Sequence, residues 1–393
     1  MSKTYKSATQ VKFNRNTAAC YIKSNNFKPE LQIIIQGKIP ETMSYKLNAN
    51  CLKSSIAGVL LLLLQTGFTQ GNYAELDKAF QEKQNLLGKD LVVMLWKKDD
   101  TIVYKKEMGT FNSKTVAPIA SASKWLTAAV VLQMVDEGKL SLDDNISRYL
   151  PEFEKYGKNY ITLRHCLSHL TGIDDEGRLL KKLIQRKKFA SLEEEVNSFA
   201  ARDIRTNPGT DFWYGNVGLN IAARVVEVVS KKKFDLLIRQ KLFVPLTMRK
   251  TTFSTLDGSP VNPSGGARST ADDYLKFLVM LLNKGNYAGK QILSEESVNE
   301  LMKIQTTQAQ IKYAPKSAMG FNYALGSWVL ESQDPQQATA LASPGLFGTW
   351  PMIDYCRGYA YLVFVKNILG EERADIHLEL KKIIDNQMPG DCK

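Results

Sequence analysis

The sequence predicts an α+β fold in which both ends of the chain supply strands to one antiparallel sheet that is flanked by helices. Strand-like segments occupy residues 90–109 and recur between 323 and 367. The stretch 140–250 that separates them is mostly helix and loop, which indicates a helical insertion. With 393 residues, 44% of them hydrophobic, the chain is long enough to bury a large core.

After residue 72, the first element is a helix pattern at 73–84. Residues 90–109 then read as two strands joined by a turn at Lys97–Asp100. The helix pattern at 123–137 is apolar on nearly every side, so this helix is expected to be buried rather than amphipathic. Gly138 follows it as the expected C-terminal stop.

The second half of the chain contains further helices, which are followed by strands. Two more apolar-periodic helices are expected at 215–232 and 271–285, the latter capped by Thr270 or Asp272. Strands and a closing helix come last, with the strands expected within 323–330, 349–355 and 357–367 and the helix at 374–387.

The N-terminal segment 1–71 is expected to be non-catalytic and to carry an export signal. Its stretch 54–71 contains an apolar run that is too short to span a bilayer but suits a signal peptide. The run lies at the right depth if translation starts at Met43, and the mature protein would then begin near Asn72. The catalytic domain is accordingly expected at 72–393.

This interpretation makes the protein exported, either periplasmic or extracellular. Two alternatives stay open for the apolar run: an uncleaved membrane anchor, and a buried helix with no targeting role. In an exported protein, Cys356 and Cys392 are candidates for a disulfide that pins the C-terminus. No cysteine or histidine spacing indicates a metal site.

The formal net charge of +12 does not indicate a nucleic-acid partner. Residues 1–71 hold nine Lys or Arg residues and two acidic ones, so the rest of the chain is nearly balanced. The basic cluster at 181–188 is interpreted as a solvated helix face rather than a phosphate track.

Ser121 and Lys124 stand at the start of the buried helix, three residues apart, and therefore share one helical face. A serine hydroxyl needs a base to become a nucleophile, and burial can lower the pKa of a lysine enough for that role. In the alternative interpretation, Ser121 only caps the helix and Lys124 extends to solvent. A second Ser-x-x-Lys pair, Ser230 and Lys233, lies at an exposed helix end and is interpreted as structural.

Tyr214 and Asn216 form the only Tyr-x-Asn sequence in the chain, between a Pro-Gly turn and a long helix. A phenol near a lysine can relay a proton, and an amide can orient both the lysine and a substrate carbonyl. The alternative for Tyr214 is a core tyrosine with a satisfied hydroxyl.

These residues belong to stretches that resemble a known family between about residues 88 and 366. The stretches are IASASKWLTAAVVLQMVDEGKLSLDDNISRYLPE, ITLRHCLSHLTGI, NPGTDFWYGNVGLNIAARVVE, GGARSTADDYLKFLVMLLNKG and YALGSWVL. They resemble the serine β-lactamase-related family of class C β-lactamases, penicillin-binding proteins, D-Ala-D-Ala carboxypeptidases, family VIII esterases and D-amino-acid amidases. The resemblance implies a β-lactamase/transpeptidase-like fold, no cofactor, and an active site between a helical and a sheet domain.

The resemblance also implies a role for each residue. Ser121 becomes the acyl-accepting nucleophile, Lys124 its base, Tyr214 the proton relay, and Asn216 the amide that orients the lysine and the substrate. Each role comes from a position that matches the family's own motif.

The third motif of the family departs from the usual pattern here. Ser343, in the sequence Ser-Pro-Gly, stands where a lysine or histidine is usual, so no cation is expected there to hold a substrate carboxylate. Gly345 still allows a substrate backbone to approach closely. The N–H groups of Ser121 and Leu346 are the candidates for the oxyanion hole.

Three functions are therefore compatible with the sequence. The first is a serine hydrolase that acts on small esters or amides through an acyl-enzyme. The second is a β-lactamase or D-Ala-D-Ala carboxypeptidase acting on cell-wall peptides, and the third is a catalytically silent penicillin-binding-like module. Some aromatic residues are candidates either for an acyl pocket or for the core: Trp213, Phe321, Tyr323, Phe347 and Trp350.

Overall fold

The computed structural model describes residues 10–11, 20–21, 73–98, 101–175, 189–255, 257–365, 373–388, 390 and 392. The chain divides into two units, Met1–Thr69 and Gln70–Lys393. In the first unit, strands β1 (Gln10–Val11) and β2 (Cys20–Tyr21) pair antiparallel. The apolar run at 54–71 and the basic cluster at 181–188 lie outside the described residues, so the expectations about them stay predictions.

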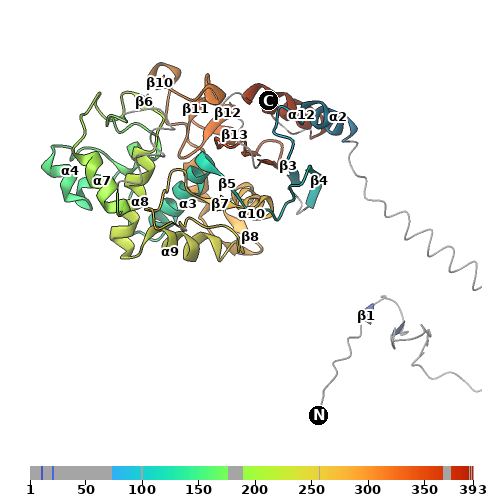
Figure 1. Cartoon of the computed structure of the whole chain (residues 1–393), viewed down its shortest axis with the longest axis horizontal. Coiled ribbons are helices and arrows are strands. Elements are labelled where there is room, and N and C mark those ends of the chain that lie inside the picture. The colour runs from blue at the N-terminus through green and yellow to red at the C-terminus, as the bar shows by residue number, and fades with distance from the viewer. Residues whose placement is uncertain are drawn as a thin grey trace, which may run out of the picture. The chain divides into compact units, whose positions relative to one another are not determined.

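The second unit is built on a sheet of seven strands among the described residues, in the order β11-β12-β13-β14-β15-β3-β4 (Figure 1). The strands are β3 (Leu91–Lys97), β4 (Thr101–Met108), β11 (Asn322–Tyr323), β12 (Trp328–Ser332), β13 (Ala338–Ala342), β14 (Trp350–Asp354) and β15 (Tyr359–Val365). Every neighbouring pair is antiparallel. β3 comes from the start of the unit and pairs with β15 near its end, which confirms the predicted fold class.

Alternation of side chains along β3 and β15 gives the sheet two apolar faces. Val92, Met94 and Trp96 of β3 join the core under α3 and α10. The intervening Leu91 and Val93 join a second core under α2 and α12. The sheet is therefore covered by helices on both sides, as the sequence predicts.

The helices fall into two sets, those on the sheet and those in the insertion. They are α2 (Ala74–Lys83), α3 (Ser123–Asp136), α4 (Pro151–Lys155), α5 (Leu163–Leu167), α7 (Leu192–Ala200), α8 (Val217–Ser230), α9 (Phe234–Ile238), α10 (Ala271–Leu282), α11 (Glu295–Met302) and α12 (Ala374–Gln387). Figure 1 shows α4, α7 and α8 together on one side of the unit and α2 beside α12 on the other. Among the described residues, none of the helices is long and apolar enough to cross a membrane.

Short turns and strand pairs connect these elements. The helical turns are η1 (Ala120–Ala122), η2 (Ile146–Arg148), η4 (Arg239–Phe243), η5 (Gln308–Gln310) and η6 (Lys316–Ala318). The short pairs are β5 (Ala117–Pro118) with β7 (Arg268–Ser269), β6 (Phe212–Trp213) with β10 (Ile311–Tyr313), and β8 (Asn286–Tyr287) with β9 (Lys290–Gln291). β6 and β10 pair in parallel. This pairing joins the segment that precedes α8 to the segment that precedes β11.

The central helix α3 is buried as its apolar pattern predicts. Every residue from Ser123 to Met134 is buried, including the lysine at its first turn. Gly138 adopts a positive φ of 66° just past the end of the helix, in the conformation expected of a stop. At α10, the cap is Thr270, whose side chain accepts a hydrogen bond from the Asp273 N–H.

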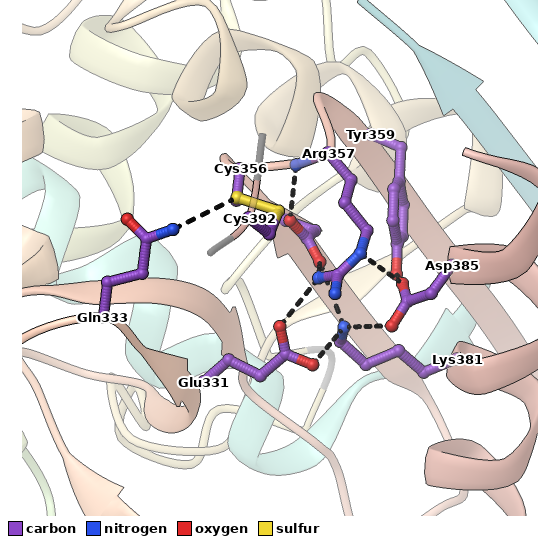
Figure 2. Close-up of a disulfide and its surroundings, with 9 residues drawn as sticks. Glu331, Gln333, Cys356, Arg357, Tyr359, Lys381, Asp385 and Cys392 are labelled. Atoms are coloured by element: carbon purple, nitrogen blue, oxygen red, sulfur yellow. Dashed lines mark hydrogen bonds and ion pairs between the residues drawn. A yellow bond between two sulfur atoms is a disulfide. The ribbon is translucent and has the colours of Figure 1, made fainter. Parts of the chain in front are cut away.

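The C-terminal residues are tied to the sheet by a disulfide between Cys356 and Cys392 (Figure 2). Beside it, the ammonium group of Lys381 contacts three carboxylates, those of Glu331, Asp354 and Asp385. The cross-link and this ionic cluster together fix α12 against the turn between β14 and β15.

Candidate active site

Ser121 lies in the η1 turn that leads directly into α3. The residue before it, Ala120, holds a positive φ of 45°, a conformation that is strained for any residue with a Cβ atom. One turn later, the side chain of Lys124 points back toward the serine, and its Nζ lies 3.2 Å from Ser121 Oγ. The local spacing in the sequence therefore places the hydroxyl and the amine within hydrogen-bond distance.

Lys124 is enclosed by neutral oxygen acceptors. Its side chain is buried, with 1% exposure. Besides the serine hydroxyl, Nζ contacts the carbonyl oxygen of Ser264 at 2.8 Å and Oδ1 of Asn216 at 3.4 Å. The two carbonyl oxygens can only accept hydrogen bonds, so among these three contacts the one with Ser121 is where a proton can move in either direction.

Tyr214 and Asn216 reach this lysine from the segment between β6 and α8. Nζ of Lys124 lies 4.9 Å from the centre of the Tyr214 ring. The Asn216 N–H donates to Oδ2 of Asp175 at 3.0 Å, which fixes the backbone of the motif. A Cβ atom on Gly215 would come within 1.6 Å of that same carboxylate oxygen, so the middle position of this Tyr-x-Asn motif requires glycine.

A group of aromatic rings packs around Tyr214. Its ring centre lies 4.7 Å from that of His169 and 5.1 Å from that of Trp328. Tyr323 completes the group and its hydroxyl lies 3.2 Å from His169 Nε2. Burial raises the pKa of Tyr323 far above the ordinary value, and the nearby Tyr214 raises it further, so Tyr323 stays a neutral phenol.

The third motif, Ser343 to Gly345, lies against the η1 turn that carries Ser121. Ser343 follows β13 and is buried, and its hydroxyl donates to the Gly326 carbonyl oxygen at 3.2 Å. The same Oγ lies 3.5 Å from the carbonyl oxygen of Ser121. A Cβ atom on Gly345 would come within 2.2 Å of the Ile119 carbonyl oxygen, so glycine is needed for this loop to reach the η1 turn. Leu346 is the next residue of the loop and is half-buried.

The structure thus brings five of the expected residues to one place: Ser121, Lys124, Tyr214, Asn216 and Ser343. The second Ser-x-x-Lys pair is separate from them. Ser230 is the last residue of α8, and Lys233 is exposed in the turn after it. Among the aromatic candidates, Tyr323 and Trp350 are core residues, whereas Trp213, Phe321 and Phe347 are half-buried.

Sequence reasoning missed several groups that shape this site. Ser264 contributes only a backbone oxygen, which has no signal in the sequence. Asp175 and His169 are polar residues that lie near Gly172 in the sequence. Their contacts with the Tyr-x-Asn segment depend on the tertiary fold, so the sequence does not indicate them. Within the part of the chain that the structure describes, no group of three or more His, Cys, Asp or Glu side chains is arranged to hold a metal ion.

Comparison with known proteins identifies relatives of this arrangement. A protein from Mycobacterium tuberculosis strain H37Rv, Rv1367c, is 26% identical over 322 residues, which cover 66% of this chain and 79% of the relative. A solved structure of a candidate beta-lactamase from Bacteroides dorei DSM 17855 is 26% identical, with a TM-score of 0.71, and covers 80% of this chain and 99% of its own.

A more distant structure shares the fold alone. EstCE1, described as a hydrolase with promiscuous acyltransferase activity, has a TM-score of 0.67 at 19% identity and covers 80% of this chain and 98% of its own. At the level of the whole domain, a family model described as Beta-lactamase matches residues 76–382, a span that contains Ser121, Lys124, Tyr214, Asn216 and all the strands of the seven-stranded sheet. The chain therefore belongs to the beta-lactamase family.

Proposed function

We propose that this protein is a serine hydrolase that cleaves small esters or neutral amides through an acyl-enzyme on Ser121. The observation that carries the proposal is the position of Lys124, whose buried Nζ lies 3.2 Å from Ser121 Oγ. Two of its hydrogens are held by the oxygens of Ser264 and Asn216, so the lone pair of the neutral amine faces the serine hydroxyl. This is the geometry that a general base requires.

In the acylation step, Lys124 Nζ accepts the Ser121 proton while Oγ bonds to the substrate carbonyl carbon. The carbonyl oxygen becomes an oxyanion, for which the N–H groups of Ser121 and Leu346 are the proposed donors. The proton then passes by way of Tyr214 to the leaving alcohol or amine as its bond to the carbon breaks. Deacylation repeats the sequence with water as the nucleophile and restores the serine hydroxyl.

Ser343 supports the restriction to neutral substrates. A hydroxyl has a single hydrogen, and that of Ser343 is donated to the Gly326 carbonyl oxygen. The residue therefore offers neither a positive charge nor a spare hydrogen to a substrate carboxylate. Penicillins and D-Ala-D-Ala peptides carry such a carboxylate, which makes them poorer substrates than neutral esters in this proposal.

The test is hydrolysis of a short-chain p-nitrophenyl ester by the wild type and by Ser121→Ala and Lys124→Ala. Loss of an activated nucleophile or its base is expected to lower kcat/KM by about 10³-fold or more. The matched controls are Ser230→Ala and Lys233→Ala, which alter the second Ser-x-x-Lys pair and are expected to leave turnover unchanged.

The other outcomes distinguish the rival functions. Faster hydrolysis of a cephalosporin than of the ester, or a lasting penicillin adduct on Ser121, would replace the esterase proposal by the β-lactamase or carboxypeptidase one. No turnover of any substrate, together with no labelling of the folded wild type by a fluorophosphonate, would indicate a catalytically silent binding module.

We also propose that the mature protein is exported. The disulfide between Cys356 and Cys392 supports export, because such cross-links persist mainly in oxidising compartments. Cell fractionation combined with N-terminal sequencing tests this proposal. An N-terminus near Asn72 in the exported fraction is expected, and a reduced protein in the cytosol would contradict it.

A further inference from the structure

We propose that Ser123 and Thr127 are positioning residues that hold the Ser264 carbonyl oxygen against Lys124 Nζ. This inference rests on the proposed function and extends it to two hydroxyl groups of α3. Neither hydroxyl is among the groups that the sequence motifs indicate as catalytic. Their role comes from the way α3 contacts residues 262–267, a segment called the carbonyl loop below.

Two hydroxyl groups of α3 bind the carbonyl loop on either side of Ser264. Thr127 Oγ1 donates to the carbonyl oxygen of the preceding residue, Pro263, at 2.7 Å. Ser123 Oγ accepts a hydrogen bond from the Ala267 N–H, beyond Ser264, at 3.1 Å. The oxygen that binds the lysine therefore lies between two points at which the loop is tied to the lysine's own helix.

The oxygen that binds the lysine belongs to the peptide group between Ser264 and Gly265. This oxygen lies 2.8 Å from Lys124 Nζ, and the N–H of the same peptide group donates to the Asn262 carbonyl oxygen at 3.2 Å. The Ser264 hydroxyl also donates to Asn262, at Oδ1 and 2.8 Å. Because a peptide group is planar, the contact at its N–H also sets the direction of its carbonyl.

The preceding peptide group, between Pro263 and Ser264, is held at both of its polar atoms. Thr127 binds its carbonyl oxygen, and its N–H donates to Oδ1 of Asn220 on α8 at 3.1 Å. The two peptide groups are joined at the Ser264 Cα atom, so a displacement of the first also displaces the second. Thr127 therefore acts on the lysine by fixing the position of its acceptor.

Ala267 ties the same loop to the turn that carries Ser121. Its N–H donates to Ser123 Oγ, which lies two residues after the proposed nucleophile. Its carbonyl oxygen accepts from the N–H of Ile119, two residues before the nucleophile, at 3.0 Å. These contacts fix the acceptor of the lysine and the proposed nucleophile relative to each other.

The contacts between α3 and the carbonyl loop are shielded from water. Ser123, Thr127 and Ser264 are each 0% exposed. A buried N–H or carbonyl group that loses its partner carries the full cost of its desolvation. When either hydroxyl of α3 is removed, the loop is therefore expected to shift toward other partners.

The consequence concerns the direction of the lone pair on Lys124. In the proposed function, the neutral amine must direct this lone pair at Ser121 Oγ while its hydrogens are held by other acceptors. The Ser264 oxygen holds one of these hydrogens. A displacement of about 1 Å in a catalytic arrangement can lower the rate by about 10²-fold. The two hydroxyl groups are therefore expected to control kcat and to leave substrate binding unchanged.

The experiment measures kcat and KM for p-nitrophenyl ester hydrolysis in the wild type, Ser123→Ala and Thr127→Val. We expect kcat to fall by about 10-fold to 100-fold in each variant, while KM changes by less than about twofold. Thr127→Ser restores the hydroxyl group and is expected to bring kcat to within about threefold of the wild type. The rate at which a fluorophosphonate labels Ser121 is expected to fall and recover in parallel, because labelling reports the activation of the nucleophile.

The matched control is Ser297→Ala, which removes another buried serine hydroxyl in contact with α3. That hydroxyl donates to Asp136 at the opposite end of the helix, about 18 Å along the axis from Lys124. The control therefore loses a comparable hydrogen bond without a change near the base, and its kcat is expected to stay within about twofold of the wild type.

The remaining outcomes separate the possible failures. Unchanged kcat and labelling in Ser123→Ala and Thr127→Val would overturn the inference, and so would an equal fall in kcat in Ser297→Ala. Failure of Thr127→Ser to recover kcat would assign Thr127 to packing alone. A wild type with neither turnover nor labelling defeats the proposed function instead, so the two failures are distinguishable. If one of the two variants does not fold, the other decides.

Discussion

Two of the buried lysines lie in opposite kinds of surroundings. Lys124 at the start of α3 is 1% exposed and contacts a hydroxyl, an amide oxygen and a backbone carbonyl oxygen. Lys381 in α12 is 3% exposed and contacts three carboxylates (Figure 2). One lysine is therefore solvated by neutral dipoles, and the other is neutralised by full charges.

This difference matches the proposed role of Lys124 as a base and the role of Lys381 as a structural cation. Burial alone lowers the pKa of a lysine, but the carboxylates around Lys381 outweigh burial and raise the pKa of that residue. It stays an ammonium group and serves as the counter-ion of Asp354, which is 0% exposed. At Lys124 the contacts with Ser121, Asn216 and Ser264 are with uncharged oxygens, which suits the proposed transfer of a proton between Lys124 and Ser121. The kind of acceptor thus indicates the role of each lysine.

The largest expected effect comes from Lys124→Arg. Arginine places a permanent positive charge at the site, because the guanidinium group does not lose its proton in proteins, and it therefore cannot act as a base. Ester hydrolysis is expected to fall by about 10³-fold, within the range for loss of a general base. Steady-state kinetics measure this effect, with Lys381→Arg as the control that keeps its activity. Substantial turnover by Lys124→Arg would mean that the site needs a cation rather than a base.

The next effect concerns stability at the other lysine. Lys381→Met leaves Asp354, which is buried, and Asp385, which is half-buried, with Arg357 as their shared cation, and the loss of the lysine is expected to cost about 3 kcal/mol of unfolding free energy. Urea denaturation at pH 7 measures this cost. Lys382→Met, at the neighbouring exposed position on α12, is the matched control and is expected to change stability by less than about 0.5 kcal/mol. Equal stability of both variants would show that the ionic cluster contributes nothing.

Lys124→Met sharpens the comparison in the opposite direction. Methionine has nearly the same shape, and the contacts with Ser121, Asn216 and Ser264 that it loses are with uncharged oxygens. We expect a change in unfolding free energy within about 1 kcal/mol, with a gain in stability as the favoured sign, because catalytic groups are often held at the expense of stability. The same urea measurement applies. A loss as large as that of Lys381→Met would contradict the distinction between the two sites.

The sequence was sufficient for most of the sheet and for the central helix. The apolar runs of β3 and β15, and the apolar pattern of α3, follow from burial on more than one face, which is directly visible in the order of residues. β13 was missed, because its sequence Ala338–Ala342 is rich in alanine and has no strong strand preference. Its place between β12 and β14 is set by pairing with both neighbours, which a local pattern does not record.

The candidate site also contains some contacts that a local sequence pattern predicts and others that depend on the tertiary fold. Ser121 and Lys124 were predictable as partners because a helical turn alone brings positions three apart together. The proximity of Asn216 to Lys124 required a resemblance to known proteins, since 92 residues separate the two positions. The Ser264 carbonyl left no recognisable pattern, because a backbone oxygen has no sequence signature.

Another buried basic residue, His377 on α12, extends the comparison to a group that burial keeps uncharged. Its ring stacks on Trp350 at 4.3 Å between centres, and burial lowers its pKa to about 3. The folded protein therefore keeps His377 neutral, whereas the unfolded chain takes up a proton near the ordinary value of about 6.5. Stability from this residue is present above pH 6.5 and is lost as the pH falls from there toward 3.

The loss between pH 7 and pH 5 is expected to reach about 2 kcal/mol in the wild type and to be absent in His377→Phe. Urea denaturation of both proteins at the two pH values isolates the effect, because the carboxylates titrate equally in both and cancel in the difference. The comparison uses the change with pH rather than the absolute stability, since phenylalanine also loses the contact between Nδ1 and the Tyr361 hydroxyl. An identical loss in both proteins would mean that His377 accepts a proton inside the fold, and that neutral surroundings alone do not hold a buried basic group uncharged.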